Sequence, residues 1–292
     1  MPEISNRKKI VRLLQRKKII FPYRPKTILK KVDQGPKPKN QFCLPMNQVL
    51  KNQQIWNQFI ETTKDTLYNI EFRCAPLGTT NKCAVIVEPR DHPHLEYVIR
   101  NVSYFLGDDW SILLMHGIQN TNASEILGSK LPNIGLLKLP VNDLKPTSNP
   151  GYNELLTSVS FYNSIPAETI LIFQTDSILL RKGIDEFLEF DYVGAPWCFG
   201  GMGNGGLSLR KKSKMIEIIL KTPYATSGTG AEDVYFSTLA KRTPNTKLPT
   251  IQKAMAFSVE TMYHPSPLGV HDFYCYTPEP QLRNLLNTVK YT

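Results

Sequence analysis

The stretch from Glu168 to Leu180 constrains the fold most, because one carboxylate interrupts a short apolar run. Ile170 to Phe173 is rich in β-branched residues, which is typical of a strand buried on both faces of a sheet. The run stops at Gln174-Thr-Asp-Ser and resumes at Ile178. Asp176 is therefore expected at the carboxyl end of a buried strand, where α/β sheets bind ligands and metals. Either a cation compensates this carboxylate, or backbone amides satisfy it as a turn residue.

Strand-like and helix-like patterns alternate on both sides of this stretch. The alternation predicts a doubly wound α/β sheet. The expected strands are residues 83–87, 110–115, 134–139, 170–173, 191–197 and 207–209. The expected helices are residues 47–68, 95–105, 155–162, 183–190 and 211–220, with a further helix that begins near residue 232.

The positive charge of the chain is concentrated at its N-terminus. Residues 1–40 carry a balance of +11, whereas the other 252 residues carry −1. We expect a solvated arm at 1–40, a helical lead-in at 41–82 and one folded body at 83–292. The arm could instead be a basic amphipathic segment that binds anionic lipid or nucleic acid. A nucleic-acid partner is disfavoured because the body has no excess of basic residues.

Cysteine usage and hydropathy point to a cytoplasmic location. The five cysteines are scattered and lack Cys-x-x-Cys spacing, which favours a reducing compartment and argues against a structural zinc site. No apolar run approaches the roughly 18 residues of a membrane span. The basic N-terminus has no adequate hydrophobic region for a secretory signal.

Polar residues follow two other expected strands. The first ends at Val87 and Glu88 with Arg90 just beyond, and the second ends at His116 and Gly117. An anionic ligand at this edge would be bound by Arg90 and by amides at the start of the next helix. Otherwise Arg90 is a surface residue that caps a loop.

Two later stretches also carry candidate site residues. Residues 200–206 contain five glycines, which permit close backbone approach but lack the spacing of a Walker loop or a dinucleotide fingerprint. Glu232 and Asp233 begin a helical pattern, where the helix dipole favours acids. Successive side chains on a helix diverge by about 100°, so the two acids are expected to have different roles.

Six motifs occur in the order found in one protein family. They are Glu88-Pro-Arg-Asp-His-Pro, Gln174-Thr-Asp-Ser, Asp191-Tyr-Val-Gly-Ala-Pro-Trp, Gly203-Asn-Gly-Gly-Leu-Ser-Leu-Arg, Glu232-Asp-Val and Pro267-Leu-Gly-Val-His. Over about residues 83 to 275 the chain resembles the glycosyltransferase-like DUF5672 group of fungi, plants, bacteria and large DNA viruses. More broadly it resembles GT-A glycosyltransferases. The resemblance implies a Rossmann-like GT-A fold with a mixed central sheet flanked by helices, forming a single catalytic domain. For a viral member, the location would be the host cytoplasm or the virion.

The resemblance also implies roles for individual residues. Asp176 and His271 would hold a divalent metal, Mn²⁺ or Mg²⁺, although Gln174 replaces the first acid of the family's Asp-x-Asp motif. Asp233 would be the general base of an inverting transfer and Glu232 a sugar contact. The residues expected at the donor are Val87, Glu88, Arg90, His116, Gly117, Gln174, Thr175 and Asp176. Those expected at the sugar or acceptor are Trp197, Asn204, Gly205, Gly206 and Glu232.

The function expected from this resemblance is metal-dependent glycosyl transfer of the hexosyltransferase type. The donor would be a nucleotide-diphosphate sugar, with UDP-sugar favoured, and the acceptor a hydroxyl on a glycan or a protein. Two alternatives stay open. One is a nucleic-acid-binding or nucleotidyl-transfer protein that uses the basic arm, and the other is an inactive sugar-binding domain, suggested by Gln174.

Overall fold

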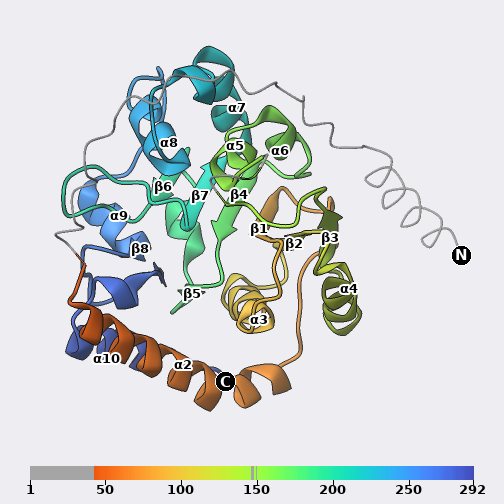
Figure 1. Cartoon of the computed structure of the whole chain (residues 1–292), viewed down its shortest axis with the longest axis vertical. Helices are drawn as coiled ribbons and strands as arrows, with labels where there is room; N and C mark the ends of the chain where they lie inside the picture. The colour runs from red at the N-terminus through yellow and green to blue at the C-terminus, as the bar shows by residue number, and fades with distance from the viewer. Residues whose placement is uncertain (1–42, 146–147, 149) are drawn as a thin grey trace, which may run out of the picture.

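The computed structural model describes residues 43–145, 148 and 150–292 (Figure 1). The arm predicted at residues 1–40 lies outside this range. In chain order the elements are α2 (Met46–Asn69), β1 (Lys82–Glu88), α3 (Leu95–Leu106), β2 (Ser111–His116), α4 (Thr121–Lys130), β3 (Gly135–Lys138), α5 (Tyr152–Leu156), α6 (Val159–Asn163), β4 (Thr169–Phe173), β5 (Ser177–Leu179), η1 (Ile184–Phe187), β6 (Tyr192–Gly194), β7 (Leu207–Lys211), α7 (Lys212–Lys221), η2 (Tyr224–Thr226), α8 (Glu232–Ala240), α9 (Ile251–Phe257), β8 (Ser258–Val259), β9 (Gly269–His271), η3 (Phe273–Cys275) and α10 (Glu279–Asn287).

A mixed sheet of six strands forms the centre of the protein. Its order is β3-β2-β1-β4-β7-β6, and β7 runs antiparallel to both β4 and β6. The remaining neighbours pair in parallel, so β1, β2, β3, β4 and β6 all point the same way. This confirms the predicted mixed central sheet flanked by helices. The carboxyl ends of β1, β2, β4 and β6 consequently share one edge with the start of β7.

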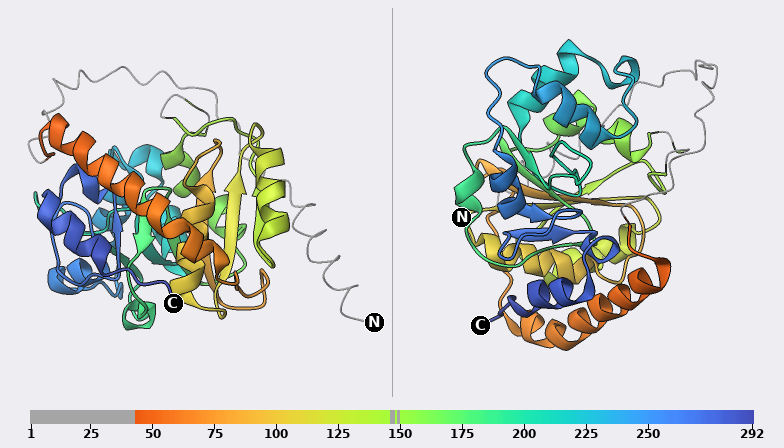
Figure 2. Two further views of the ribbon diagram at one scale, coloured as in Figure 1. Left: turned by 90° about the horizontal axis from the view of Figure 1, so that it is seen from below. Right: turned by 90° about the vertical axis from the view of Figure 1, so that its left-hand side faces the viewer.

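Both faces of this sheet are covered by helices, as Figure 2 shows. Side chains of β1 alternate, so that Ala84 and Ile86 belong to one core while Cys83 and Val85 belong to the other. The first core includes residues of α2, α3 and α10, and the second includes residues of α5, α6, α7 and α8. Trp56 of α2 is therefore buried in the same core as the central sheet. Among the described residues, no helix is long and apolar enough to cross a membrane.

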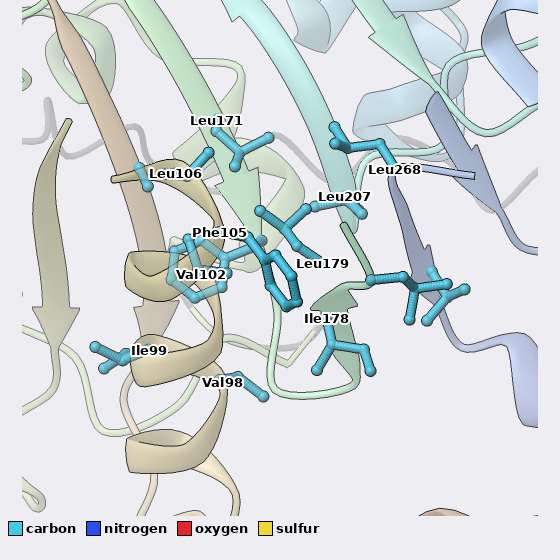
Figure 3. Packing of buried hydrophobic residues seen from close by; sticks show 14 of the residues in the cluster. Val98, Ile99, Val102, Phe105, Leu106, Leu171, Ile178, Leu179, Leu207 and Leu268 are labelled. Carbon is cyan, nitrogen blue, oxygen red and sulfur yellow. The ribbon is translucent and has the colours of Figure 1, made fainter. Parts of the chain in front are cut away.

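Helix α3 links the central sheet to a second, smaller sheet. In Figure 3, Val98, Val102 and Phe105 of α3 lie among side chains of β4 and β5. Asn101 of the same helix donates from Nδ2 to the Leu179 carbonyl (2.9 Å) and accepts from the Leu179 amide (2.8 Å). This pair of hydrogen bonds satisfies the free edge of β5 and fixes the strand that follows Asp176.

The smaller sheet has the order β5-β9-β8, which the sequence patterns did not predict. Ser177 of β5 pairs with His271 of antiparallel β9, and Val259 of parallel β8 pairs with Val270. The residues just beyond these pairs, Asp176 and Glu260, are thereby brought to the same end of the sheet as His271.

Two helix predictions were wrong in detail. The helix expected at 155–162 is two short helices, because Ser158 adopts an extended backbone and its Oγ accepts a hydrogen bond from the Phe161 amide at the start of α6. The helix expected at 183–190 is only the 3₁₀ turn η1, which follows Gly183 in a left-handed conformation (φ 115°). The predicted strands and the remaining predicted helices are present with end points shifted by a few residues.

Candidate functional site

The turn between β4 and β5 places Asp176 at the edge of the central sheet where the carboxyl ends of β1, β2, β4 and β6 lie. The Ser177 amide donates to the Gln174 carbonyl (3.1 Å), and the Gln174 amide donates to Ser177 Oγ (3.2 Å). Ser177 Oγ in turn donates to the Gly206 carbonyl (2.9 Å), which joins this turn to the glycine loop, residues 200–206. The Asp176 side chain stays 31% exposed at the carboxyl end of β4, as predicted.

Asp176 and His271 meet across the smaller sheet. His271 Nε2 lies 3.5 Å from Asp176 Oδ1 and 3.0 Å from Gln174 Oε1. Asp272, directly after His271, has a left-handed backbone (φ 45°), and its amide donates to the Asp176 carbonyl (3.3 Å). Backbone in this region is uncommon for residues other than glycine, and such residues cluster at functional sites. The two residues expected to share a metal are thus neighbours.

The glycine loop approaches these side chains more closely than any larger residue would allow. A Cβ atom at Gly206 would lie 2.0 Å from His271 Nε2, and one at Gly205 would lie 2.0 Å from Glu232 Oε1. Neither glycine has a left-handed backbone. Glycine is required at both positions by close contact with site residues, not by turn geometry.

Replacing Gly206 with alanine should therefore displace His271. We expect Gly206→Ala to lower the free energy of unfolding by about 1–3 kcal/mol, as overpacked positions do. Gly230→Ala is the matched control, since a Cβ there has no neighbour within 4 Å among the described residues, and it should stay within about 0.5 kcal/mol of wild type. Urea titrations of the three proteins measure the difference. Equal stability of the two variants would contradict the tight contact at Gly206.

The two acids at the start of α8 have different surroundings. Glu232 is buried and accepts two hydrogen bonds of 3.0 Å, one on each oxygen, from fully buried Arg210. Burial raises the pKa of Glu232, and the neighbouring Arg210 charge opposes this effect. Asp233 is half-buried and accepts hydrogen bonds from the Gly205 amide (3.3 Å) and the Val234 amide (2.7 Å). Arg210 occupies both oxygens of Glu232, whereas no basic side chain in the described part of the chain pairs with Asp233, whose carboxylate faces the glycine loop.

At the ends of β1 and β2, one asparagine ties the two loops together. Asn120 donates to the carbonyls of Glu88 (2.9 Å) and Arg90 (3.0 Å), and it accepts from the Gly117 amide (2.8 Å). Buried Glu88 accepts from Arg90 Nε and Nη2, both at 2.8 Å. Asn120 was not predicted as a site residue, although its place directly before α4 is a typical helix-capping position.

The predicted donor residues are brought to one edge but differ in accessibility. Arg90 is 63% exposed at its side chain. Its hydrogen bonds to Glu88 raise its pKa, and the charge of nearby Asp176 adds to this shift. In contrast, the structure buries the side chains of four predicted donor residues, which are Val87, Glu88, His116 and Thr175. Arg90, Gln174 and Asp176 are the predicted donor residues whose side chains remain accessible there.

A second acid of the site, Glu260, was not predicted. It follows β8 and is 7% exposed, and its Oε1 accepts from Asn204 Nδ2 at 2.7 Å. The same Oε1 lies 3.7 Å from His271 Nδ1. Burial raises the pKa of Glu260 to about 7, while His271 opposes the shift. A single acid at the end of a short apolar pair is too weak a sequence signal to predict a site residue.

Asp176 and His271 are suited to form part of the coordination shell of a hard divalent cation. Among the described residues, Asp176 Oδ1 is a buried atom without a hydrogen-bond partner, and His271 Nε2 lies 3.5 Å from it. Carboxylate oxygen with imidazole nitrogen suits Mn²⁺ or Mg²⁺ better than a thiol-bound metal. Within residues 43–145, 148 and 150–292, no group of three or more His, Cys, Asp or Glu side chains is arranged to hold a metal. The protein would therefore supply two ligands and leave the others to water or substrate.

The model of one protein family, described as Protein of unknown function (DUF5672), matches residues 139–271. Residues 139–271 are therefore similar to this family, in agreement with the resemblance predicted from the motifs. The matched segment is shorter than the predicted one, because it begins at Leu139 and omits β1 and β2. No curated protein matches the sequence.

Solved glycosyltransferase structures are similar to the chain at low identity. Glycosyltransferase GlyE of Streptococcus pneumoniae TIGR4 is 12% identical, with a TM-score of 0.42 over 66% of this chain and 54% of that one. Mouse xyloside xylosyltransferase 1 is 12% identical, with a TM-score of 0.42 over 66% and 97%. Mannosyltransferase PcManGT from Pyrobaculum calidifontis, in complex with GDP-Man and Mn²⁺, is 14% identical, with a TM-score of 0.40 over 80% and 69%. The chain thus spans about half the length of the GlyE chain.

Proposed function

We propose that the protein is a metal-dependent glycosyltransferase of the GT-A type. It would move a sugar from a nucleotide-diphosphate sugar, with UDP-sugar favoured, to a hydroxyl acceptor. The observation that carries the proposal is the meeting of Asp176, His271 and the glycine loop at the carboxyl edge of the central sheet, with Asp233 beside them. Ligands bind at this edge in open α/β sheets. The resemblance of the sequence motifs to those of GT-A glycosyltransferases supports the same class of reaction.

In this proposal Asp176 and His271 hold the divalent cation, Mn²⁺ or Mg²⁺. The cation, when bound, neutralises the charge of the departing nucleoside diphosphate. Gln174, whose Oε1 lies 3.0 Å from His271 Nε2, stands where the Asp-x-Asp motif of GT-A enzymes has its first acid. Arg90 lies at the neighbouring strand end and provides a positive charge for the donor diphosphate.

Asp233 would take the proton from the attacking hydroxyl. The hydroxyl oxygen forms a bond to the anomeric carbon while the bond from that carbon to the phosphate oxygen breaks, so the configuration inverts. The amides of Gly205 and Val234 orient the Asp233 carboxylate for this task. The acceptor would lie near Trp197, whose ring stacks on Phe199 with centroids 5.7 Å apart. Trp197 itself is buried, so a glycan or protein acceptor would contact the exposed ring of Phe199 that stacks on it.

Asp176→Asn tests the proposal directly. Wild-type protein should show a thermal shift with UDP-sugars that requires Mn²⁺, because binding to the native state alone stabilises it. Asp176→Asn should lose the Mn²⁺-dependent part of that shift while its melting temperature without ligand is unchanged. Asp185→Asn, in η1 away from the site, is the matched control and should behave as wild type. An Asp176→Asn variant with the full Mn²⁺-dependent shift would make Asp176 a turn residue only.

The inactive sugar-binding alternative has a different signature. It is favoured by Gln174 at the first position of the metal motif. Such a domain would show the Mn²⁺-dependent shift yet release no UDP when donor and acceptor sugars are supplied together. Measuring UDP release alongside the thermal shift separates this alternative from a working transferase.

A further inference from the structure

Glu260 connects two parts of the site that lie far apart in the sequence. Its Oε1 accepts a 2.7 Å hydrogen bond from Asn204 of the glycine loop and lies 3.7 Å from His271 Nδ1. The side chain of Glu260 is 9% exposed and that of His271 is 10% exposed. A carboxylate placed this far from water is retained only where a charge or a hydrogen bond compensates it.

The two nitrogens of His271 face different neighbours. Nδ1 lies 3.7 Å from Glu260 Oε1, whereas Nε2 lies 3.5 Å from Asp176 Oδ1 and 3.0 Å from Oε1 of the Gln174 side-chain amide. A neutral imidazole carries one proton, and the group bound to one nitrogen decides which form is present. With the proton on Nδ1, the Nε2 lone pair is directed to the side where Asp176 lies.

Unpartnered atoms gather at this point of the structure. Among the described residues, six buried side-chain nitrogen or oxygen atoms lack a hydrogen-bond partner. Three of them, Asp176 Oδ1, Glu260 Oε2 and His271 Nδ1, belong to this group of neighbouring side chains. Buried polar atoms are normally paired, so their accumulation indicates a place built for a ligand and its supporting carboxylate.

We propose that Glu260 is a positioning residue that holds the His271 proton on Nδ1 and so presents the Nε2 lone pair beside Asp176 for a divalent cation. The inference rests on the proposed metal-dependent function and adds a residue to it. Carboxylates that orient metal-binding histidines in this way fix the tautomer and raise the basicity of the ligand. Because Asn204 shares the same oxygen, Glu260 also couples the glycine loop to the orientation of His271.

The tautomer of His271 can be measured in the unaltered chain. Long-range ¹H–¹⁵N spectra at about pH 8.5, where an ordinary imidazole is neutral, distinguish a protonated ring nitrogen from an unprotonated one. Comparison with His271→Gln assigns the signals. We expect Nδ1 protonated and Nε2 unprotonated. A His271 ring protonated on Nε2 would overturn the proposal, and this result does not depend on whether any Glu260 variant folds.

The second test measures the binding of Mn²⁺ alone. Binding is monitored by electron paramagnetic resonance as the loss of the signal of free Mn²⁺. Glu260→Ala should raise the Kd for Mn²⁺ by about 10–100-fold, the usual effect of removing such a partner. Glu260→Gln keeps an oxygen that can accept from Nδ1 and should recover part of the loss. Glu279→Gln, on α10 in a surface pair with Lys51, is the control and should leave the Kd unchanged.

Asp176→Asn separates failure of this inference from failure of the proposed function. If Asp176→Asn weakens Mn²⁺ binding and Glu260→Ala does not, the metal site stands and the role of Glu260 is overturned. If wild-type protein binds no Mn²⁺, or if Asp176→Asn binds it as wild type does, the proposed metal site itself is overturned. Weaker binding by both variants, with recovery in Glu260→Gln, supports both proposals.

Discussion

Asp233→Asn is expected to lower kcat by about 10²–10⁴-fold with little change in donor affinity. Asparagine keeps the size of the side chain and one acceptor oxygen, so it can still bond to the Gly205 or Val234 amide that orients the carboxylate. It cannot accept the proton of the attacking hydroxyl. The loss should therefore appear in the chemical step and not in ground-state binding.

Steady-state kinetics with the best UDP-sugar from the thermal-shift screen measure this effect. Asp185→Asn again provides the control for an acid outside the site. The anomeric configuration of the product, read by NMR, should be opposite to that of the donor. An active Asp233→Asn variant, or a product with retained configuration, would remove Asp233 as the base and favour a retaining mechanism without one.

The central sheet was predictable because its strands leave a strong pattern. β1, β2 and β4 are strands of five to seven residues whose apolar centres are buried on both faces, and each is followed by a polar motif. The smaller sheet was not predictable, since β5, β8 and β9 have only two or three residues each. Such short strands have no measurable period, and their pairing depends on contacts between distant segments.

Part of the site was also visible in the sequence. Asp176 and His271 were named from their motifs, and the structure brings them together. Glu260 and Asn120 were missed because their importance arises from contacts with residues 56 and 32 positions away, at Asn204 and Glu88. The ion-pair partner of Glu232, which is Arg210, could not be predicted either, because the local sequence does not show which charged side chain will be buried against Glu232.

Removal of Arg210 is expected to have the largest effect on the stability of the protein. Arg210 is fully buried and donates to both oxygens of Glu232, while its guanidinium lies 5.4 Å from the ring centroids of Tyr192 and Phe236. Arg210→Met leaves Glu232 buried without a compensating charge. We expect a loss of about 3–5 kcal/mol in the free energy of unfolding, the usual result of breaking a buried ion pair. Arg283→Met, which breaks an exposed pair with Glu279 on α10, should change it by at most about 1 kcal/mol.

The double variant Arg210→Met, Glu232→Met distinguishes the lost charge from lost packing. Replacing both partners by apolar groups removes the uncompensated carboxylate, so the double variant should be more stable than Arg210→Met alone. If it is less stable, packing by Arg210 accounts for the effect and the ion pair does not.

The pH dependence of Arg210→Met provides an independent check with a defined sign. Burial already raises the Glu232 pKa above its ordinary 4.5, and removing Arg210 takes away the charge that opposes this shift. A group whose pKa is higher in the folded state binds its proton more tightly there, so stability falls as pH rises through the folded pKa. The deficit of Arg210→Met should therefore be large at neutral pH and shrink as the pH is lowered to 4.5 and below, because Glu232 is protonated in both states only below its unfolded pKa. A deficit that does not change with pH would mean that Glu232 is not the group left uncompensated. Because Asp233 follows Glu232 directly, the same ion pair also fixes the start of α8 from which the proposed base reaches the glycine loop.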